Sequence, residues 1–149
     1  MTTKQNNPLT KIWDCNLFNI KNATNDVLKR DPRILYIAFD IHNTICDTDQ
    51  QFYFYAVETL QFISQCPNMK LIMWSYYQQN ILDDWNLYLK NNKVSVDYIN
   101  QNPDFKSPRV FYDILLDSRA GFNGQSHWRQ ILQALTYSNT LIENNVKVI

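Results

Sequence analysis

The feature that most restricts the fold is an apolar run at residues 34–39, which ends abruptly at Asp40. A run this short, rich in Ile, Tyr and Phe and bounded by polar residues, is typical of a strand buried on both faces in a parallel sheet. Ligands of open α/β sheets bind just outside the carboxyl ends of the strands. A carboxylate buried there requires a cation, hydrogen bonds or water. Asp40 is therefore the first candidate for a functional residue.

Two further apolar runs also end in polar side chains. Residues 69–74 lead to Ser75, and residues 111–116 lead to Asp117. The carboxyl ends of parallel strands share one edge of the sheet, so neighbouring strands bring the residues that follow them together. We therefore expect Asp40, Ser75 and Asp117 to converge on one crevice.

Helical patterns separate these strands. Thr48 and Gln51 fit a capping box, which predicts that a helix follows them and continues to about residue 65. Ser126 fits the N-cap of a last helix. The other expected elements are helices at about 78–91 and 126–141 and a half-buried edge strand at 94–98.

Strands that alternate with helices predict a three-layer α/β/α sandwich with a mainly parallel, Rossmann-like sheet. With 149 residues, 45% of them hydrophobic, the chain can bury the core of one domain. The formal net charge is zero, which gives no electrostatic case for nucleic acid or an anionic membrane as a partner. Three cysteines without metal-like spacing, and no apolar leader or membrane-length run, predict a cytoplasmic protein.

The candidate residues suit phosphoryl chemistry. Asp40 and Asp117 offer carboxylate oxygens, and Mg²⁺ takes few protein ligands together with waters and phosphate oxygens. Ser75 can donate a hydrogen bond to a phosphoryl oxygen, and Lys106 can supply fixed positive charge. Phosphoryl transfer depends mainly on such positioning and electrostatics.

The run that ends at Asp40, with Thr44 four residues later, resembles motif I of the haloacid dehalogenase-like (HAD) superfamily. In that motif an apolar strand leads into Asp-x-Asp-x-Thr or Asp-x-x-x-Thr. The other motifs of the superfamily have counterparts in the same order: motif II at residues 73–75, motif III at Lys106 and motif IV at residues 113–119.

The resemblance covers about residues 34–135 and is closest to short, capless members of the superfamily. It implies a Mg²⁺-dependent phosphatase in which Asp40 is the nucleophile and forms an aspartyl-phosphate. It also implies that Asp40, the backbone carbonyl of His42 and Asp117 hold the Mg²⁺.

The same resemblance assigns the phosphoryl group to Ser75 and Lys106. Arg109 is an alternative to Lys106, since it lies on the same approach to the last strand.

The chain departs from the superfamily pattern at two chemically important positions. His42 stands where phosphatases of the superfamily usually carry the Asp that protonates the leaving group, and a histidine can do such acid/base work. Ser118 replaces the second acid of motif IV and removes a negative charge near the metal. The alternative function is therefore a catalytically weakened HAD-like module for binding or regulation.

Neither of the intervals that carry a lid in HAD enzymes is long enough here for a large cap domain. We expect residues 1–33 to form an N-terminal extension packed on the core and residues 34–149 to form the HAD-like α/β domain. An open site favours a phosphorylated substrate of macromolecular size, or a lid supplied by another subunit or by residues 1–33. The sequence leaves oligomerisation and the identity of the substrate open.

Overall fold

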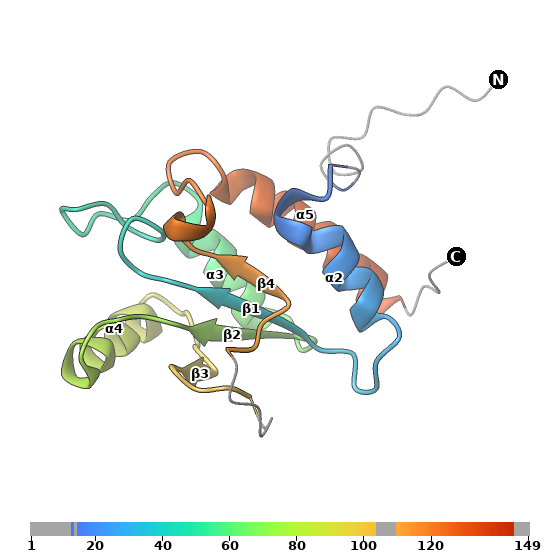
Figure 1. Cartoon of the computed structure of the whole chain (residues 1–149), viewed down its shortest axis with the longest axis horizontal. Coiled ribbons are helices and arrows are strands. Elements are labelled where there is room, and N and C mark those ends of the chain that lie inside the picture. The colour runs from blue at the N-terminus through green and yellow to red at the C-terminus, as the bar shows by residue number, and fades with distance from the viewer. Residues whose placement is uncertain (1–12, 14, 104–109, 145–149) are drawn as a thin grey trace.

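Within the part of the chain that the structure describes, four strands form one sheet and all run parallel. The structure, a computed structural model, describes residues 13, 15–103 and 110–144. The strand order is β3-β2-β1-β4, so the first strand lies in the interior of the sheet (Figure 1). The strands are β1 (Leu35–Phe39), β2 (Met69–Met73), β3 (Tyr98–Ile99) and β4 (Ile114–Leu116).

Helices flank this sheet, which confirms the predicted α/β class and its parallel, Rossmann-like sheet, and the described residues form no large cap domain. Three helices follow β1, β2 and β4 in the chain, as expected for βαβ units. The helical segments are η1 (Leu17–Asn19), α2 (Ile20–Val27), α3 (Ala56–Gln65), α4 (Gln79–Asn91), η2 (Ser118–Ala120) and α5 (Trp128–Glu143).

The two faces of the sheet are covered differently. Leu35, Ile37 and Phe39 belong to one hydrophobic cluster with residues of α2, α3, α4 and α5. Ala38 and Ile72 are also fully buried but lie outside this cluster, because successive side chains of a strand point to opposite faces. The strands β3 and β4, which are consecutive in the chain, lie at opposite edges of the sheet.

Residues before β1 contribute to the core. Helix α2 lies beside α5 in Figure 1, and the hydroxyl groups of Thr24 and Ser138 are 2.8 Å apart and buried between the two helices. Thr24 also donates to the carbonyl oxygen of Ile20, so the Ser138 hydroxyl is the donor in the pair. Ile20, Ala23 and Val27 of α2 thus belong to the hydrophobic core, whereas residues 1–12 and 14 lie outside the described range, and the division of the chain at residue 33 stays a prediction.

The predicted helix after Thr48 starts later than the sequence pattern indicated, at Ala56. The capping-box interpretation was wrong, because the Asp47 carboxylate accepts hydrogen bonds from the backbone N–H groups of Asp49 and Gln51 at 2.9 Å. The segment 45–55 therefore forms a loop, which we call the β1–α3 loop. In Figure 1 this loop and α4 both lie beyond the arrowheads of β1 and β2.

Other boundaries also differ from the predictions. The predicted edge strand at 94–98 is reduced to the two residues of β3, and β4 starts at Ile114 rather than at residue 111. The last helix begins at Trp128, so Ser126 is not its N-cap. In the described parts of the chain, no helix combines the length and the apolarity needed to cross a bilayer.

Candidate functional site

Asp40 is the first residue after β1 and is held at the boundary between core and solvent. Its backbone N–H donates to the carbonyl oxygen of Leu116 at 3.2 Å, which continues the pairing of β1 with β4. One carboxylate oxygen accepts a hydrogen bond from the N–H of Ile41 at 2.8 Å. Only 8% of the Asp40 surface is exposed. This burial places a carboxylate at the carboxyl edge of the sheet, as the sequence predicted.

Two hollows open beside Asp40, and together we call them the crevice. The smaller has a volume of about 140 Å³, the larger about 250 Å³, and both are lined by Asp40, Ser75 and Tyr76. His42 and Arg119 line the smaller hollow. Asp117 lines the larger hollow, together with the Trp74 side chain, whose indole nitrogen is buried without a hydrogen-bond partner in the described structure.

Asp117 occupies the equivalent position at the end of β4. It precedes η2, and its carboxylate accepts the backbone N–H of Arg119 at 2.9 Å. The guanidinium of Arg119 lies over the ring of Tyr76, 4.4 Å from the ring centroid, which is a cation–π geometry. A positive charge is thereby held at the rim of the crevice near two carboxylates.

Electrostatics in the crevice act mainly on Asp40. Burial raises the pKa of its carboxyl above the ordinary value, and the charge of Asp117 raises it further. The hydrogen bond from Ile41, the charge of Arg119 and the hydroxyl of Ser75 act in the opposite direction. Burial is the largest of these effects and leaves the pKa of Asp40 raised, which indicates a carboxylate that a cation or a proton would stabilise.

A single helical turn follows Asp40, in which the N–H groups of Thr44 and Ile45 both donate to the carbonyl oxygen of Ile41. Asn43 adopts a left-handed conformation with φ of 58°, which Asn tolerates better than most residues. The turn leaves His42 exposed, whereas Thr44 is fully buried. The segment after β1 thus presents His42 to the crevice and fixes Thr44 in the core.

Contacts with residues 118–128 hold the turn after Asp40 in place. The Thr44 hydroxyl accepts the N–H of Ser118 at 3.2 Å and donates to the carbonyl oxygen of His42 at 3.4 Å. The indole N–H of Trp128 donates to the Thr44 carbonyl oxygen at 2.7 Å. A Cβ on Gly124 would come within 2.7 Å of the same oxygen, so only glycine fits there.

Four of the residues predicted from sequence line the crevice: Asp40, His42, Ser75 and Asp117. The other two, Lys106 and its alternative Arg109, lie outside the described residues. The sequence interpretation missed Arg119, although its position two residues after Asp117 at a strand end was a usable signal. Arg119 is the cation that the described structure places at the crevice.

The donor set of the crevice restricts which metal it could hold. No three His, Cys, Asp or Glu side chains of the described residues gather closely enough to form a metal site. Mg²⁺ can bind at a site with so few protein ligands, because it commonly binds one or two carboxylates and keeps several waters. Asp40 and Asp117, whose charges repel each other, with the carbonyl oxygen of His42 nearby in the chain, fit such a partly hydrated ion.

The cysteines take no part in this site. Burial raises the pKa of the Cys46 and Cys66 thiols to about 11, so both remain protonated at neutral pH. Cys15 is exposed and, like the other two, is not in a disulfide. Nothing about these thiols indicates nucleophilic chemistry.

Comparison with known proteins bears on the fold only. No family model matches the sequence, and the comparison with curated proteins gives no match. A solved structure from Bacteroides thetaiotaomicron, described as a conserved protein, is similar with a TM-score of 0.59 and 23% sequence identity. The similarity covers 70% of this chain and 91% of the other. The chain therefore shares its α/β fold with a protein whose description states no activity.

Proposed function

We propose that the protein is a Mg²⁺-dependent phosphatase of the HAD type, which hydrolyses a phosphoester through an aspartyl-phosphate on Asp40. The observation that carries the proposal is the gathering of Asp40, Ser75 and Asp117, from the ends of three different strands, in one crevice. This is the arrangement that the resemblance to four HAD motifs implies.

The candidate residues at the crevice have different roles in the proposed reaction. The Asp40 carboxylate attacks phosphorus, and the bond to the leaving oxygen breaks as the aspartyl-phosphate forms. His42 is exposed at the crevice and donates the proton that the leaving oxygen needs. Bound Mg²⁺ supplies positive charge that reduces the repulsion between the carboxylates and the phosphate. Water then cleaves the acyl phosphate and regenerates Asp40.

Ser75 and Arg119 hold the phosphoryl group in this proposal. The Ser75 hydroxyl accepts the N–H of Tyr77 at 3.3 Å and, by hydrogen bonding, lowers the pKa of Asp40. In the proposal it donates to a phosphoryl oxygen once the phosphate is bound. Arg119 attracts the anion to the rim of the crevice. Lys106 or Arg109 is proposed to add a second positive charge.

An open crevice favours a large phosphorylated substrate. The described residues that line the crevice come from strand ends and adjoining loops, and none comes from residues 13 or 15–33. A site without a lid excludes water poorly around a small substrate. A phosphorylated macromolecule covers the crevice with its own surface, and we propose this substrate class.

A second candidate is a HAD-like module that binds or regulates with little catalysis. It is favoured by His42 and Ser118, which replace two acids of the motifs, and by the absence of a third acidic or imidazole ligand among the described residues. Losing a general acid/base group typically lowers a rate by about 10²–10⁴-fold.

Hydrolysis of p-nitrophenyl phosphate with and without Mg²⁺ separates the two candidates. The phosphatase proposal expects turnover that requires Mg²⁺ and falls to background in Asp40→Asn. The matched control is Asp26→Asn, which removes an exposed carboxylate on α2 and leaves turnover unchanged. If several phosphoesters are not hydrolysed and calorimetry detects no Mg²⁺ binding, the phosphatase proposal is wrong and the binding module remains.

A further inference from the structure

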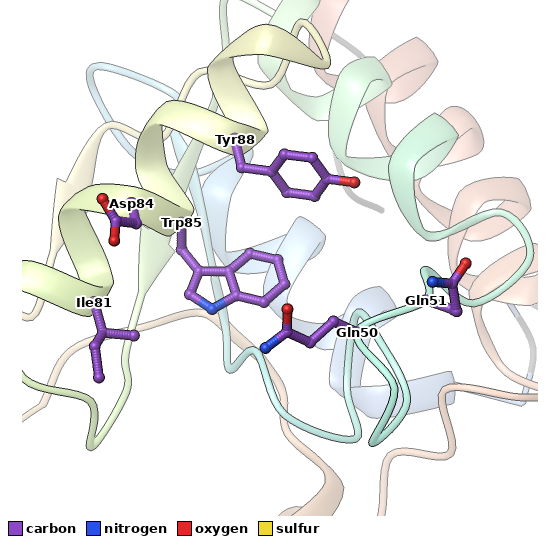
Figure 2. A pocket seen from close by; sticks show the side chains of 6 residues that line it. All are labelled: Gln50, Gln51, Ile81, Asp84, Trp85 and Tyr88. Atoms are coloured by element: carbon purple, nitrogen blue, oxygen red, sulfur yellow. The ribbon is translucent and has the colours of Figure 1, made fainter.

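A second concave surface lies apart from the crevice, between α4 and the β1–α3 loop. This α4 groove has a volume of about 460 Å³, which is within the usual range of ligand sites. Figure 2 shows the rings of Trp85 and Tyr88 projecting from α4 toward the loop. Six residues line the groove: Gln50, Gln51, Ile81, Asp84, Trp85 and Tyr88.

Of the aromatic rings at the groove, two are stacked and the third, that of Trp85, is steeply inclined to both. The Tyr88 ring stacks on Phe52, with centroids 5.4 Å apart and planes 4° apart. The Trp85 ring is inclined by 70° to both rings, at centroid distances of 5.8 and 6.4 Å. Trp85 and Tyr88 thus form two walls that meet at a corner. Such aromatic corners recognise organic cations, because the face of each ring attracts positive charge.

Acidic side chains outnumber basic ones in the segments that form the groove. Residues 45–55 contain no Lys or Arg, and the only basic residue of α4 is Lys90 in its last turn, which does not line the groove. The Asp84 carboxylate lines the groove and has no ion pair or hydrogen bond within the described structure. The acidic residues of these two segments are Asp47, Asp49, Asp83 and Asp84.

The nearby arginines do not neutralise this charge. Arg119 lies over the ring of Tyr76, and Arg129 lies 5.9 Å from the ring centroid of Tyr55. Each arginine is thus engaged with a ring outside the groove. The groove therefore combines aromatic walls with the carboxylate of Asp84, which has no ion pair in the described structure, and this combination suits a cation.

Exposed apolar side chains extend beyond the groove along the same two segments. Phe54 in the β1–α3 loop is 89% exposed, and Leu87 in α4 is 59% exposed. Neither side chain lines the groove, so a small cation bound there would leave both uncovered, whereas an extended polypeptide that continues along these segments can reach them. The exposed amides of Gln50 and Gln51 can hydrogen-bond to the backbone of such a chain.

We propose that the α4 groove binds a Lys or Arg side chain of an extended polypeptide, with the cation against Trp85 and Tyr88 and paired with Asp84. This binding does not depend on the proposed phosphatase chemistry, because none of the six groove residues lines the crevice.

The test is a fluorescence-anisotropy titration of the full chain with a labelled peptide that contains one Arg flanked by Leu, Gly and Ser. The reference peptide carries citrulline, a neutral isostere, in place of Arg. We expect the Arg peptide to bind at least tenfold more tightly, and to weaken as salt increases. Equal affinity of the two peptides would overturn the proposal, as would equally tight binding of free arginine amide, which would indicate a small-cation site.

Two matched substitutions on α4 locate the binding. Asp84→Asn should weaken binding of the Arg peptide about fivefold, whereas Asp83→Asn should not, because Asp83 is paired with Gln79 and does not line the groove. Trp85→Leu should weaken it about tenfold. Trp85 also packs on the core. If Trp85→Leu unfolds the protein for that reason, the test relies on Asp84→Asn, because Asp84 is exposed. An equal loss in Asp83→Asn and Asp84→Asn would show a diffuse charge effect instead of a site.

A final arm separates this proposal from the phosphatase proposal. Asp40→Asn should bind the Arg peptide like the unmodified chain, with no Mg²⁺ or phosphate present. Loss of peptide binding in Asp40→Asn would contradict a separate groove, while loss of hydrolysis alone would concern the crevice.

Discussion

The indole N–H of Trp128 donates a hydrogen bond of 2.7 Å to the carbonyl oxygen of Thr44, joining two residues that are 84 positions apart. Both residues are fully buried. The bond ties the start of α5 to the turn that follows Asp40. Without the indole, the Thr44 carbonyl would be left in the core without this donor, and an unsatisfied buried group costs about 1–3 kcal/mol.

Trp128→Phe should therefore lower the free energy of unfolding. The decrease should exceed the decrease expected from the smaller buried ring area by about 1–3 kcal/mol. Chemical denaturation measures this. Trp74→Phe is the matched control, because its indole nitrogen has no hydrogen-bond partner in the described structure. Equal destabilisation by the two substitutions would mean that the Trp128 hydrogen bond contributes nothing.

Gly124→Ala should destabilise the fold by about 1–3 kcal/mol through overpacking. The new Cβ would lie 2.3 Å from the Tyr53 ring and 2.7 Å from the Thr44 carbonyl oxygen, and the backbone oxygen cannot move away without shifting the turn after Asp40. The comparison is Gly121→Ala, where no atom lies within 4 Å of the new Cβ and only the positive φ of 90° resists the change. A smaller loss of stability in Gly124→Ala than in Gly121→Ala would contradict this reading.

Asp113→Asn should cost roughly 1.5–3 kcal/mol, the usual range for hydrogen bonds to charged groups. The Asp113 carboxylate accepts two hydrogen bonds from Arg30, at 2.9 and 2.6 Å, and a third from the N–H of Tyr36. Its side chain is only 5% exposed, and the pair raises the pKa of the Arg30 guanidinium.

The control for Asp113 is Asp97→Asn. Asp97 also accepts a strand N–H, from Leu71, but its pair with Lys70 is 3.8 Å long and 31–37% exposed. Exposed pairs contribute about 0–1 kcal/mol, so urea denaturation should rank Asp113→Asn as clearly more damaging. A reversed ranking would refute the prediction.

Asp40→Asn should stabilise the protein at neutral pH. Burial raises the pKa of the folded-state carboxyl above its ordinary value of 3.8, so the folded protein binds this proton more tightly than the unfolded chain does. The ionised carboxylate therefore opposes folding above the raised pKa, and this penalty disappears as the pH falls below about 3.8. Unfolding free energies at neutral and acidic pH check the sign: a gain that persists unchanged in acid would exclude the titration as its cause.

His42→Ala should lower kcat for p-nitrophenyl phosphate by about 10²–10⁴-fold if His42 supplies the proton to the leaving group. The control is His127→Ala, at the second histidine of the chain. The His127 Nδ1 accepts the N–H of Asn123 at 2.8 Å, so this substitution should reduce stability rather than kcat. An unchanged kcat in His42→Ala would assign the proton to another group.

Sequence patterns located the strands well because buried parallel strands have a local signature. The apolar runs that end at Asp40, Ser75 and Asp117 became β1, β2 and β4, and the parallel order brought their ends together. The sequence pattern placed the edge strand β3 too early in the chain. Whether a half-buried edge segment forms a strand depends more on packing against the neighbouring strand than on its own alternation of apolar and polar residues.

Other features of the fold could not be predicted from any short stretch of the sequence. Phe52 and Tyr55 have helical spacing with the residues that follow, yet both lie in the loop before α3, because Asp47 captures the backbone N–H groups that a helix would need. The pairs Arg30–Asp113 and Thr44–Trp128 join residues more than 80 positions apart, and only the folded chain brings them together.

Strand β4 contains only three residues, and the aspartates on either side of it lie in different surroundings. Asp113, at one end, is anchored to Arg30 and to the start of β1, and Asp117, at the other end, faces the crevice. Because successive residues of a strand point to opposite sides, a slip of one position would turn Asp117 away from Asp40. The contacts of Asp113 with Arg30 and Tyr36, at the end of β4 remote from the crevice, thus act together with the β1–β4 hydrogen bonds to keep Asp40 and Asp117 in register.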